Sequence, residues 1–169
     1  MTGRRRDWRR PHLQEHAMYQ RILVPVDGSA TSNLGLDEAV KLAKLTKGRL
    51  RLVHVVDQMP FLFAAEGYAA MSADVLGMLK DAGQKILDAA RERVEKEGVS
   101  VEAKLFEGLD SRLSDRILEQ IKSWQADVIV LGTHGRRGAR RMLLGSDAEL
   151  IVRTATVPIL LVRGDPPHA

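Results

Sequence analysis

The stretch RILVPVDGS at residues 21–29 decides the fold class. Its first six residues are almost all apolar, and an aspartate, a glycine and a serine follow at once. A short apolar run that ends in turn-forming residues is typical of a buried strand that opens into a loop. The stretch therefore predicts a first strand at residues 21–26.

Outward from this strand, apolar runs alternate with stretches whose apolar residues recur at helical spacings of three and four. The predicted strands cover residues 50–56, 99–108, 127–133 and 157–163, and the predicted helices cover residues 32–47, 75–97, 113–124 and 146–155. Gly48 and Gly98 stand where the first two helices are expected to stop. Alternating strands and helices, with several strands apolar throughout, predict an α/β fold with a five-stranded parallel sheet and helices on both faces.

Ligands of such sheets bind beyond the carboxyl ends of the strands, at the point where the strand order reverses. The candidate loops are those that follow residues 26, 56 and 132. The last of them begins the stretch LGTHGRRGARRMLLGSDAE at residues 131–149. Gly132 ends the predicted strand, and further glycines keep the loop free of Cβ atoms, so its N–H groups can point at an anion. Gly145 and Ser146 precede a helix, whose first N–H groups also favour phosphate.

A purely structural explanation of the same stretch stays open. Ser146 and Glu149 form the pattern Ser-x-x-Glu of a capping box, which would use the serine hydroxyl within the helix. Asp147 places a carboxylate at the helix start, where it suits the helix dipole but repels a triphosphate. The loop arginines could offset that charge, or they could be solvated; they stand at positions 136, 137, 140 and 141.

The spacing Gly132-x2-Gly135-x9-Gly145-Ser146 resembles the signature GxxGx9G[ST] of the ATP-binding branch of the universal stress protein family. The resemblance extends over residues 20–164, through ILVPVDGS, LVHVVD, ADVIVLGTHGRRG and TVPILLVR. It implies a Rossmann-like, doubly wound sheet and a homodimer that forms through the last strand, residues 157–163. The segment 108–117 departs from the shorter connection that the family tends to have, which puts the local loop shape in question but not the fold.

The resemblance also implies an ATP site, with Mg²⁺ carried by the nucleotide. The residues that match the family's adenine and ribose segments are Pro25, Val26, Asp27 and Val55. Those that match the loop around the phosphates and ribose are Gly132, Thr133, His134, Gly135, Arg136 and Arg137, and the helix start contributes Gly145, Ser146 and Asp147.

Two of the candidate side chains have other interpretations. Asp27 could simply cap the turn and the helix that follows it, although its place at the end of the first strand favours a ligand role. His54 and His134 are the only histidines in the motif regions, and neither belongs to a cluster with metal-ligand spacing, so no protein metal site is expected.

Charge and composition set the remaining expectations. The chain has 169 residues, a formal charge of +4 and no cysteine, which fits a reducing compartment, and we expect a cytoplasmic protein. Five arginines stand among residues 1–20, so residues 21–169 are nearly neutral.

The expected division of the chain is a basic, disordered arm at 1–19, one domain at 20–164 and a tail at 165–169. No apolar run is long enough to span a membrane.

The leading hypothesis is an ATP-binding protein that acts in stress response or signalling through nucleotide occupancy and dimerisation. No catalytic residues are indicated. The alternatives are a dimeric interaction protein that binds no nucleotide, a slow ATP hydrolase or adenylyl-transferring relative, and a polyanion-binding protein that contacts nucleic acid through the basic arm. The stress, the partner, and the choice among ATP, AMP and a cyclic nucleotide stay open.

Overall fold

The computed structural model describes residues 18–56, 58, 73–108, 112–133 and 145–164. The strands are β1 (Arg21–Pro25), β2 (Arg49–Val55), β3 (Val101–Phe106), β4 (Val128–Gly132) and β5 (Ile159–Val162). The helices of the described residues are α1 (Ala30–Thr46), α3 (Ala73–Lys96), α4 (Leu113–Ser123) and α5 (Ser146–Thr154). The predicted five-stranded parallel sheet is confirmed.

The strands lie in the order β3-β2-β1-β4-β5. The chain passes from β1 to β2 and β3 on one side, and then crosses back through α4 to β4 on the other side of β1. The order therefore reverses between β1 and β4, where Ile22 pairs with Val128 and Leu23 with Ile129. The carboxyl ends of these two strands flank the switch point, where two of the three predicted loops begin, those after residues 26 and 132.

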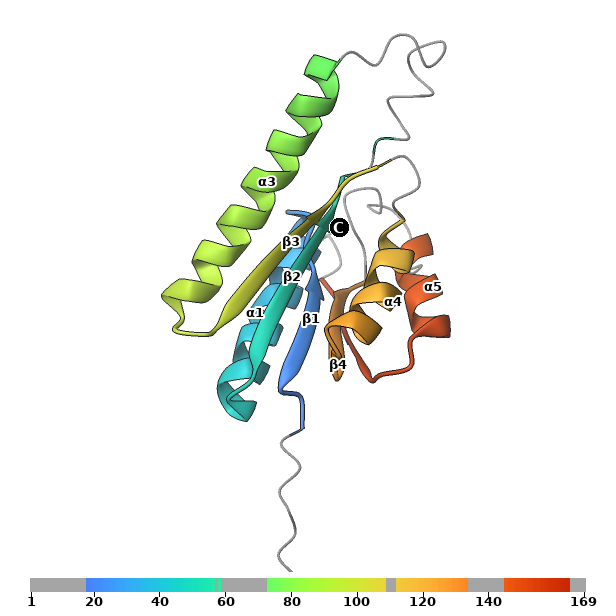
Figure 1. Cartoon of the computed structure of the whole chain (residues 1–169). Coiled ribbons are helices and arrows are strands. Elements are labelled where there is room, and N and C mark those ends of the chain that lie inside the picture. The colour runs from blue at the N-terminus through green and yellow to red at the C-terminus, as the bar shows by residue number, and fades with distance from the viewer. Residues whose placement is uncertain (1–17, 57, 59–72, 109–111, 134–144, 165–169) are drawn as a thin grey trace, which may run out of the picture.

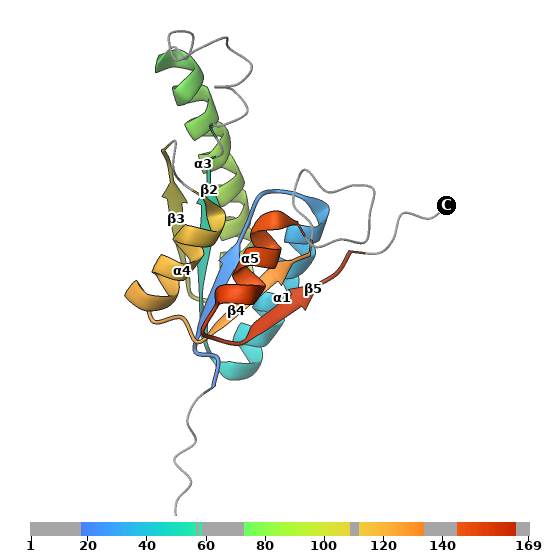
Figure 2. The same ribbon diagram turned by 90° about the vertical axis from the view of Figure 1, so that its right-hand side faces the viewer.

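Alternate residues of the strands face two separate apolar clusters. Ile22 and Val24 of β1 join a cluster with α1 and α3, whereas Leu23 joins a cluster with α4 and α5. Figure 1 shows the sheet between these two pairs of helices, and Figure 2, turned by 90°, shows α4 and α5 on their side of it. β3 lies at one edge of the sheet, and each of its residues is exposed or half-buried.

Helix α1 begins and ends close to its predicted bounds. Ser29 is its N-cap, with an extended backbone, and the side chain accepts a hydrogen bond from the N–H of Ser32 at 3.2 Å. The helix ends at Thr46, and its C-cap residue Lys47 takes the left-handed conformation at φ 56°. The predicted stop at Gly48 is therefore one residue late, because a lysine occupies the left-handed position that glycine usually fills.

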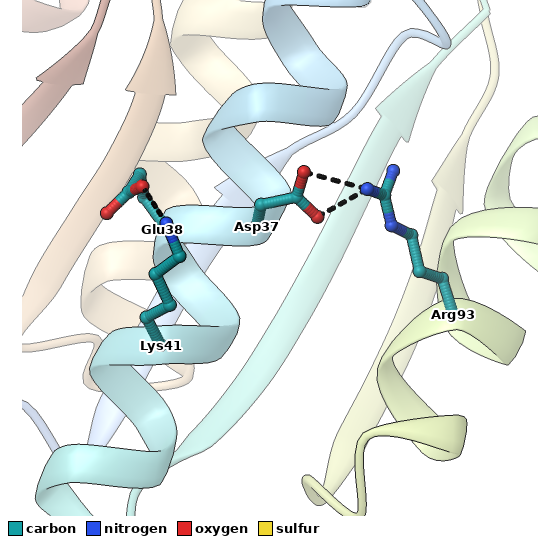
Figure 3. Close-up of polar contacts among 4 residues, drawn as sticks. All are labelled: Asp37, Glu38, Lys41 and Arg93. Atoms are coloured by element: carbon teal, nitrogen blue, oxygen red, sulfur yellow. Dashed lines mark hydrogen bonds and ion pairs between the residues drawn. The ribbon is translucent and has the colours of Figure 1, made fainter.

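Ion pairs join α1 to α3 at the surface. Arg93 of α3 donates to Asp37 of α1 at 2.7 Å, and Lys44 lies 2.5 Å from Glu97 (Figure 3 shows the Arg93 pair). All four side chains are at least one-third exposed, and exposed pairs of this kind contribute only about 0–1 kcal/mol each. The apolar cluster therefore accounts for most of the stability of this layer.

No helix within the described residues combines the length and the apolar character that crossing a membrane requires.

A matched pair of leucine substitutions tests the assignment of this core. Leu87 of α3 is 1% exposed, whereas Leu45 of α1 is 82% exposed. Leu87→Ala should lower the free energy of unfolding by about 2–5 kcal/mol because it leaves a cavity. Leu45→Ala should change it by less than about 0.5 kcal/mol. Urea unfolding followed by circular dichroism measures both, and similar losses in the two variants would contradict the assignment.

Candidate functional site

Hydrogen bonds fix the turn between β1 and α1. The N–H of Val26 donates to the carbonyl of Val53 at 2.8 Å, which extends the pairing of β1 with β2 by one residue. The N–H of Asp27 donates to the hydroxyl of Ser32 at 3.2 Å, and the N–H of Ser29 donates to Asp27 Oδ1 at 2.9 Å. The turn therefore holds its shape through contacts within the protein.

From the sequence, Asp27 could cap both the turn and the helix that follows it, and the structure shows only the first of these roles. Its carboxylate closes the turn by accepting from the N–H of Ser29, whereas the helix itself is capped by the side chain of Ser29. Asp27 is half-buried at the carboxyl end of β1. Its ligand role stays a prediction.

Apolar residues that match the adenine segment lie at the ends of β1 and β2. Pro25 and Val26 are buried, and Val55 is half-buried against the cluster of α4 and α5. Pro25 pairs with Val53, so the ends of the two strands lie side by side. Val26 packs in the cluster of α1 and α3, on the other face of the sheet from Val55.

His54 is a residue of this region whose contact the sequence did not reveal. It is 7% exposed, and its Nδ1 lies 2.7 Å from the carbonyl oxygen of Val26. From the sequence alone, the only role weighed for His54 was that of a metal ligand. Within the described residues, no group of three or more histidines and carboxylates is placed to hold a metal ion.

Gly132 lies against the first turn of α1. A Cβ atom at this position would lie 3.0 Å from the carbonyl oxygen of Thr31 and 3.2 Å from its methyl group. Few Cβ atoms in proteins have neighbours this close. A side chain at residue 132 would therefore push α1 away from β4. Packing of the helix on the strand explains this glycine without a ligand. Thr31 is therefore a second residue that the sequence did not single out.

The two ends of the glycine-rich loop meet. The N–H of Thr133 donates to the carbonyl of Val162 at 2.9 Å, and the N–H of Gly145 donates to the carbonyl of Thr133 at 3.2 Å. This bond places the start of α5 directly beside the end of β4. The other predicted loop residues lie outside the described part of the chain; they are His134, Gly135, Arg136, Arg137, Arg140 and Arg141.

Helix α5 starts without a side-chain cap, so the predicted capping box is wrong. Gly145 is the N-cap, with extended backbone at φ −61° and ψ 151°, and within the described residues it has no side-chain cap. Ser146 is already the first helical residue, so its hydroxyl is not in the capping position. Glu149 instead lies 3.6 Å from Arg153, one turn along the helix. Ser146 and Asp147 are both exposed at this helix start.

The two helices that begin at this edge of the sheet therefore differ. The first turn of α1 receives a side-chain oxygen from Ser29, whereas the first turn of α5 receives none from its N-cap or from the rest of the described chain. The unpaired N–H groups and the positive end of the dipole make an uncapped helix start suitable for an anion. The phosphate position at Gly145 and Ser146 stays a prediction.

A shallow groove of about 580 Å³ lies at the opposite edge, where the strands begin. It is lined by Gln20, Arg21, Lys47, Gly48, Arg49, Ser100 and Asp127. The carboxylate of Asp127 accepts from the N–H groups of Gln20 and Arg21, so it secures the entry to β1. The groove shares no residue with the predicted site, and we place the candidate site at the carboxyl edge on geometry.

Comparison with known proteins gives the family. Residues 18–163 match the Universal stress protein family. Universal stress protein MJ0531 of Methanocaldococcus jannaschii is 33% identical over 147 residues, which cover 86% of this chain and 83% of that protein. The crystal structure of a protein of this family from Burkholderia pseudomallei has a TM-score of 0.67 at 30% identity, covering 86% of this chain and 96% of that one.

A more distant structure was solved with a ligand. The universal stress protein from Archaeoglobus fulgidus in complex with dAMP has a TM-score of 0.62 at 21% identity, covering 86% of this chain and 98% of that one. This likeness supports the same fold. With the family match over most of the chain, the conclusion is that the chain belongs to the universal stress protein family.

Proposed function

We propose that this chain is a cytoplasmic adenine-nucleotide-binding protein, with ATP as the expected ligand, that acts in stress response or signalling through nucleotide occupancy and dimerisation. The observation that carries the proposal is the start of α5, which has a glycine N-cap and no side-chain cap. It lies directly beside the end of β4, at the point where the strand order reverses.

The phosphates would bind at Gly145 and Ser146. The first N–H groups of α5 can donate to phosphate oxygens, and the hydroxyl of Ser146 is close enough in sequence to add another donor. Among the residues that the structure describes, none beyond its chain neighbours has an atom within 4 Å of where a Cβ on Gly145 would stand. Thr133 and the predicted loop residues from His134 to Arg137 would contribute further contacts.

The base and ribose would lie over the ends of β1 and β2. Pro25, Val26 and Val55 would offer the apolar contacts for adenine, and the carboxylate of Asp27 would accept a hydrogen bond from a ribose hydroxyl. Mg²⁺ would arrive with ATP and neutralise part of the phosphate charge. The dAMP complex of the Archaeoglobus fulgidus relative supports the nucleotide class rather than the number of phosphates.

Substitution of Gly145 tests the phosphate position. The backbone at this residue suits any L-amino acid, so Gly145→Asp should cap α5 without strain and place a carboxylate where phosphate would bind. We expect the affinity for ATP, measured by calorimetry, to fall about tenfold or more, while the free energy of unfolding is unchanged or rises. Gly145→Ala is the control, and it should retain most of the affinity. Equal affinities for the two variants would argue against the position.

Asp147 gives a second test of the same position. Its carboxylate lies in the first turn of α5 and should oppose a triphosphate. Asp147→Asn should therefore strengthen ATP binding by about threefold at low salt, with a smaller gain for AMP because it carries fewer phosphate charges. Calorimetry at two salt concentrations measures the effect. A gain of the same size for both nucleotides would exclude a charge effect on the outer phosphates.

The predicted homodimer would use the last strand, residues 157–163. β5 lies at the edge of the sheet, and its Leu160 and Leu161 are 41% and 40% exposed. Apolar side chains on an edge strand favour association, because both the side chains and the open backbone groups gain partners. These exposed leucines support the proposal of a dimer.

A charge on β5 tests the dimer. Leu161→Lys should shift the protein from dimer to monomer, as measured by size-exclusion chromatography with light scattering at micromolar concentration. Leu45→Lys, a change at an 82% exposed site on α1, should leave the mass unchanged. A wild-type protein that stays monomeric, or a Leu161→Lys variant that stays dimeric, would contradict an interface on β5.

A further inference from the structure

The carbonyl of Val26 is held by a side chain rather than by the sheet. β1 ends at Pro25, and the N–H of Val26 makes a last main-chain bond to Val53. The next polar atom of the chain, the Val26 carbonyl oxygen, lies 2.7 Å from Nδ1 of His54. Two consecutive residues of β2 therefore hold both polar backbone atoms of Val26.

The chemistry of this contact fixes its direction. A carbonyl oxygen can only accept a hydrogen bond, so Nδ1 of His54 carries the proton and donates. The contact is buried, and a buried carbonyl that lost its donor would be costly. The bond therefore sets the orientation of the peptide between Val26 and Asp27, the residues expected to face adenine and ribose.

Helix α3 sets the position of the histidine ring. A Cβ on Gly83 of α3 would lie 2.9 Å from Cδ2 of His54 and 3.0 Å from the side chain of Val56. The ring can occupy its place only because residue 83 has no side chain. In contrast, a Cβ on Gly77 of the same helix would meet no atom of the described part of the chain within 4 Å.

We propose that His54 is a positioning residue of the nucleotide site. Its Nδ1–H orients the Val26–Asp27 peptide, and its ring has room beside α3 because residue 83 is a glycine. This rests on the proposed nucleotide function. His54 itself need not contact the ligand. Without the bond, the peptide would adopt its binding orientation for only part of the time, and the apparent affinity would fall by that fraction.

Two substitutions of His54 separate positioning from stability. His54→Leu keeps much of the bulk but removes the donor, so ATP affinity should fall about tenfold. His54→Asn places an amide nitrogen where Nδ1 stands, but it leaves space beside Gly83. It should therefore lower the unfolding temperature while keeping ATP affinity within about threefold of wild type. A purely structural role would make affinity follow the unfolding temperature in both variants, and that result would overturn the proposal.

The two glycines of α3 provide a matched pair. Both Gly83→Ala and Gly77→Ala raise helix propensity by the same amount. Only Gly83→Ala pushes on the His54 ring, so it alone should weaken ATP binding. Equal affinity in these two variants would overturn the role given to Gly83.

A measurement without nucleotide separates this proposal from the function on which it rests. Amide hydrogen exchange at Val26 and Asp27 should be faster in His54→Leu than in wild type, and it should stay slow in His54→Asn. If wild type binds neither ATP nor AMP, the proposed function fails, and the exchange rates alone decide whether His54 positions the turn. Unchanged exchange in His54→Leu would overturn the proposal, whatever the nucleotide result.

Discussion

The close contact between Gly132 and Thr31 is the constraint on which the carboxyl edge of the sheet depends. Helix α1 can lie over the end of β4 because residue 132 has no side chain in its way. This contact brings the β1–α1 turn next to Thr133, and Thr133 in turn holds Gly145. Three segments that are far apart in the sequence thus converge at the switch point, and each is held by bonds or packing within the protein.

The convergence also explains why one helix start, and not the other, is suited to a ligand. Ser29 supplies an oxygen to the first turn of α1, so that helix stabilises its own start. Gly145 supplies only backbone to α5. Glycine is nearly as good an N-cap as serine in free energy, so the fold loses little by leaving this start open. A site can therefore be built here at small cost to stability.

The sheet and its helices could be predicted from the sequence because their signals are local. Apolar runs mark the strands, helical spacing marks the helices, and the observed ends differ from the predicted ones by only a few residues. The position of the loops at the carboxyl edge follows from the parallel order. Residue identity and spacing alone were sufficient to predict the strands, the helices and the edge of the sheet at which the candidate loops begin.

The details of the site could not be predicted because they depend on contacts between distant segments. The capping box failed because both Gly145 and Ser146 are good N-cap residues, and the local pattern does not say which of them is extended. The reason for glycine at 132 appears only when Thr31 is placed beside it. The bond from His54 to Val26 depends on the register of β1 and β2, which no pattern in a single strand specifies.

The hydrogen bond between Gly145 and Thr133 has a consequence for how this protein can diverge. It ties the two ends of an intervening segment together, so the length of that segment is uncoupled from the position of α5. Doubling the length of a closed loop costs only about 0.6 kcal/mol. Insertions and substitutions between residues 133 and 145 should therefore have little effect on the stability of the sheet and its helices.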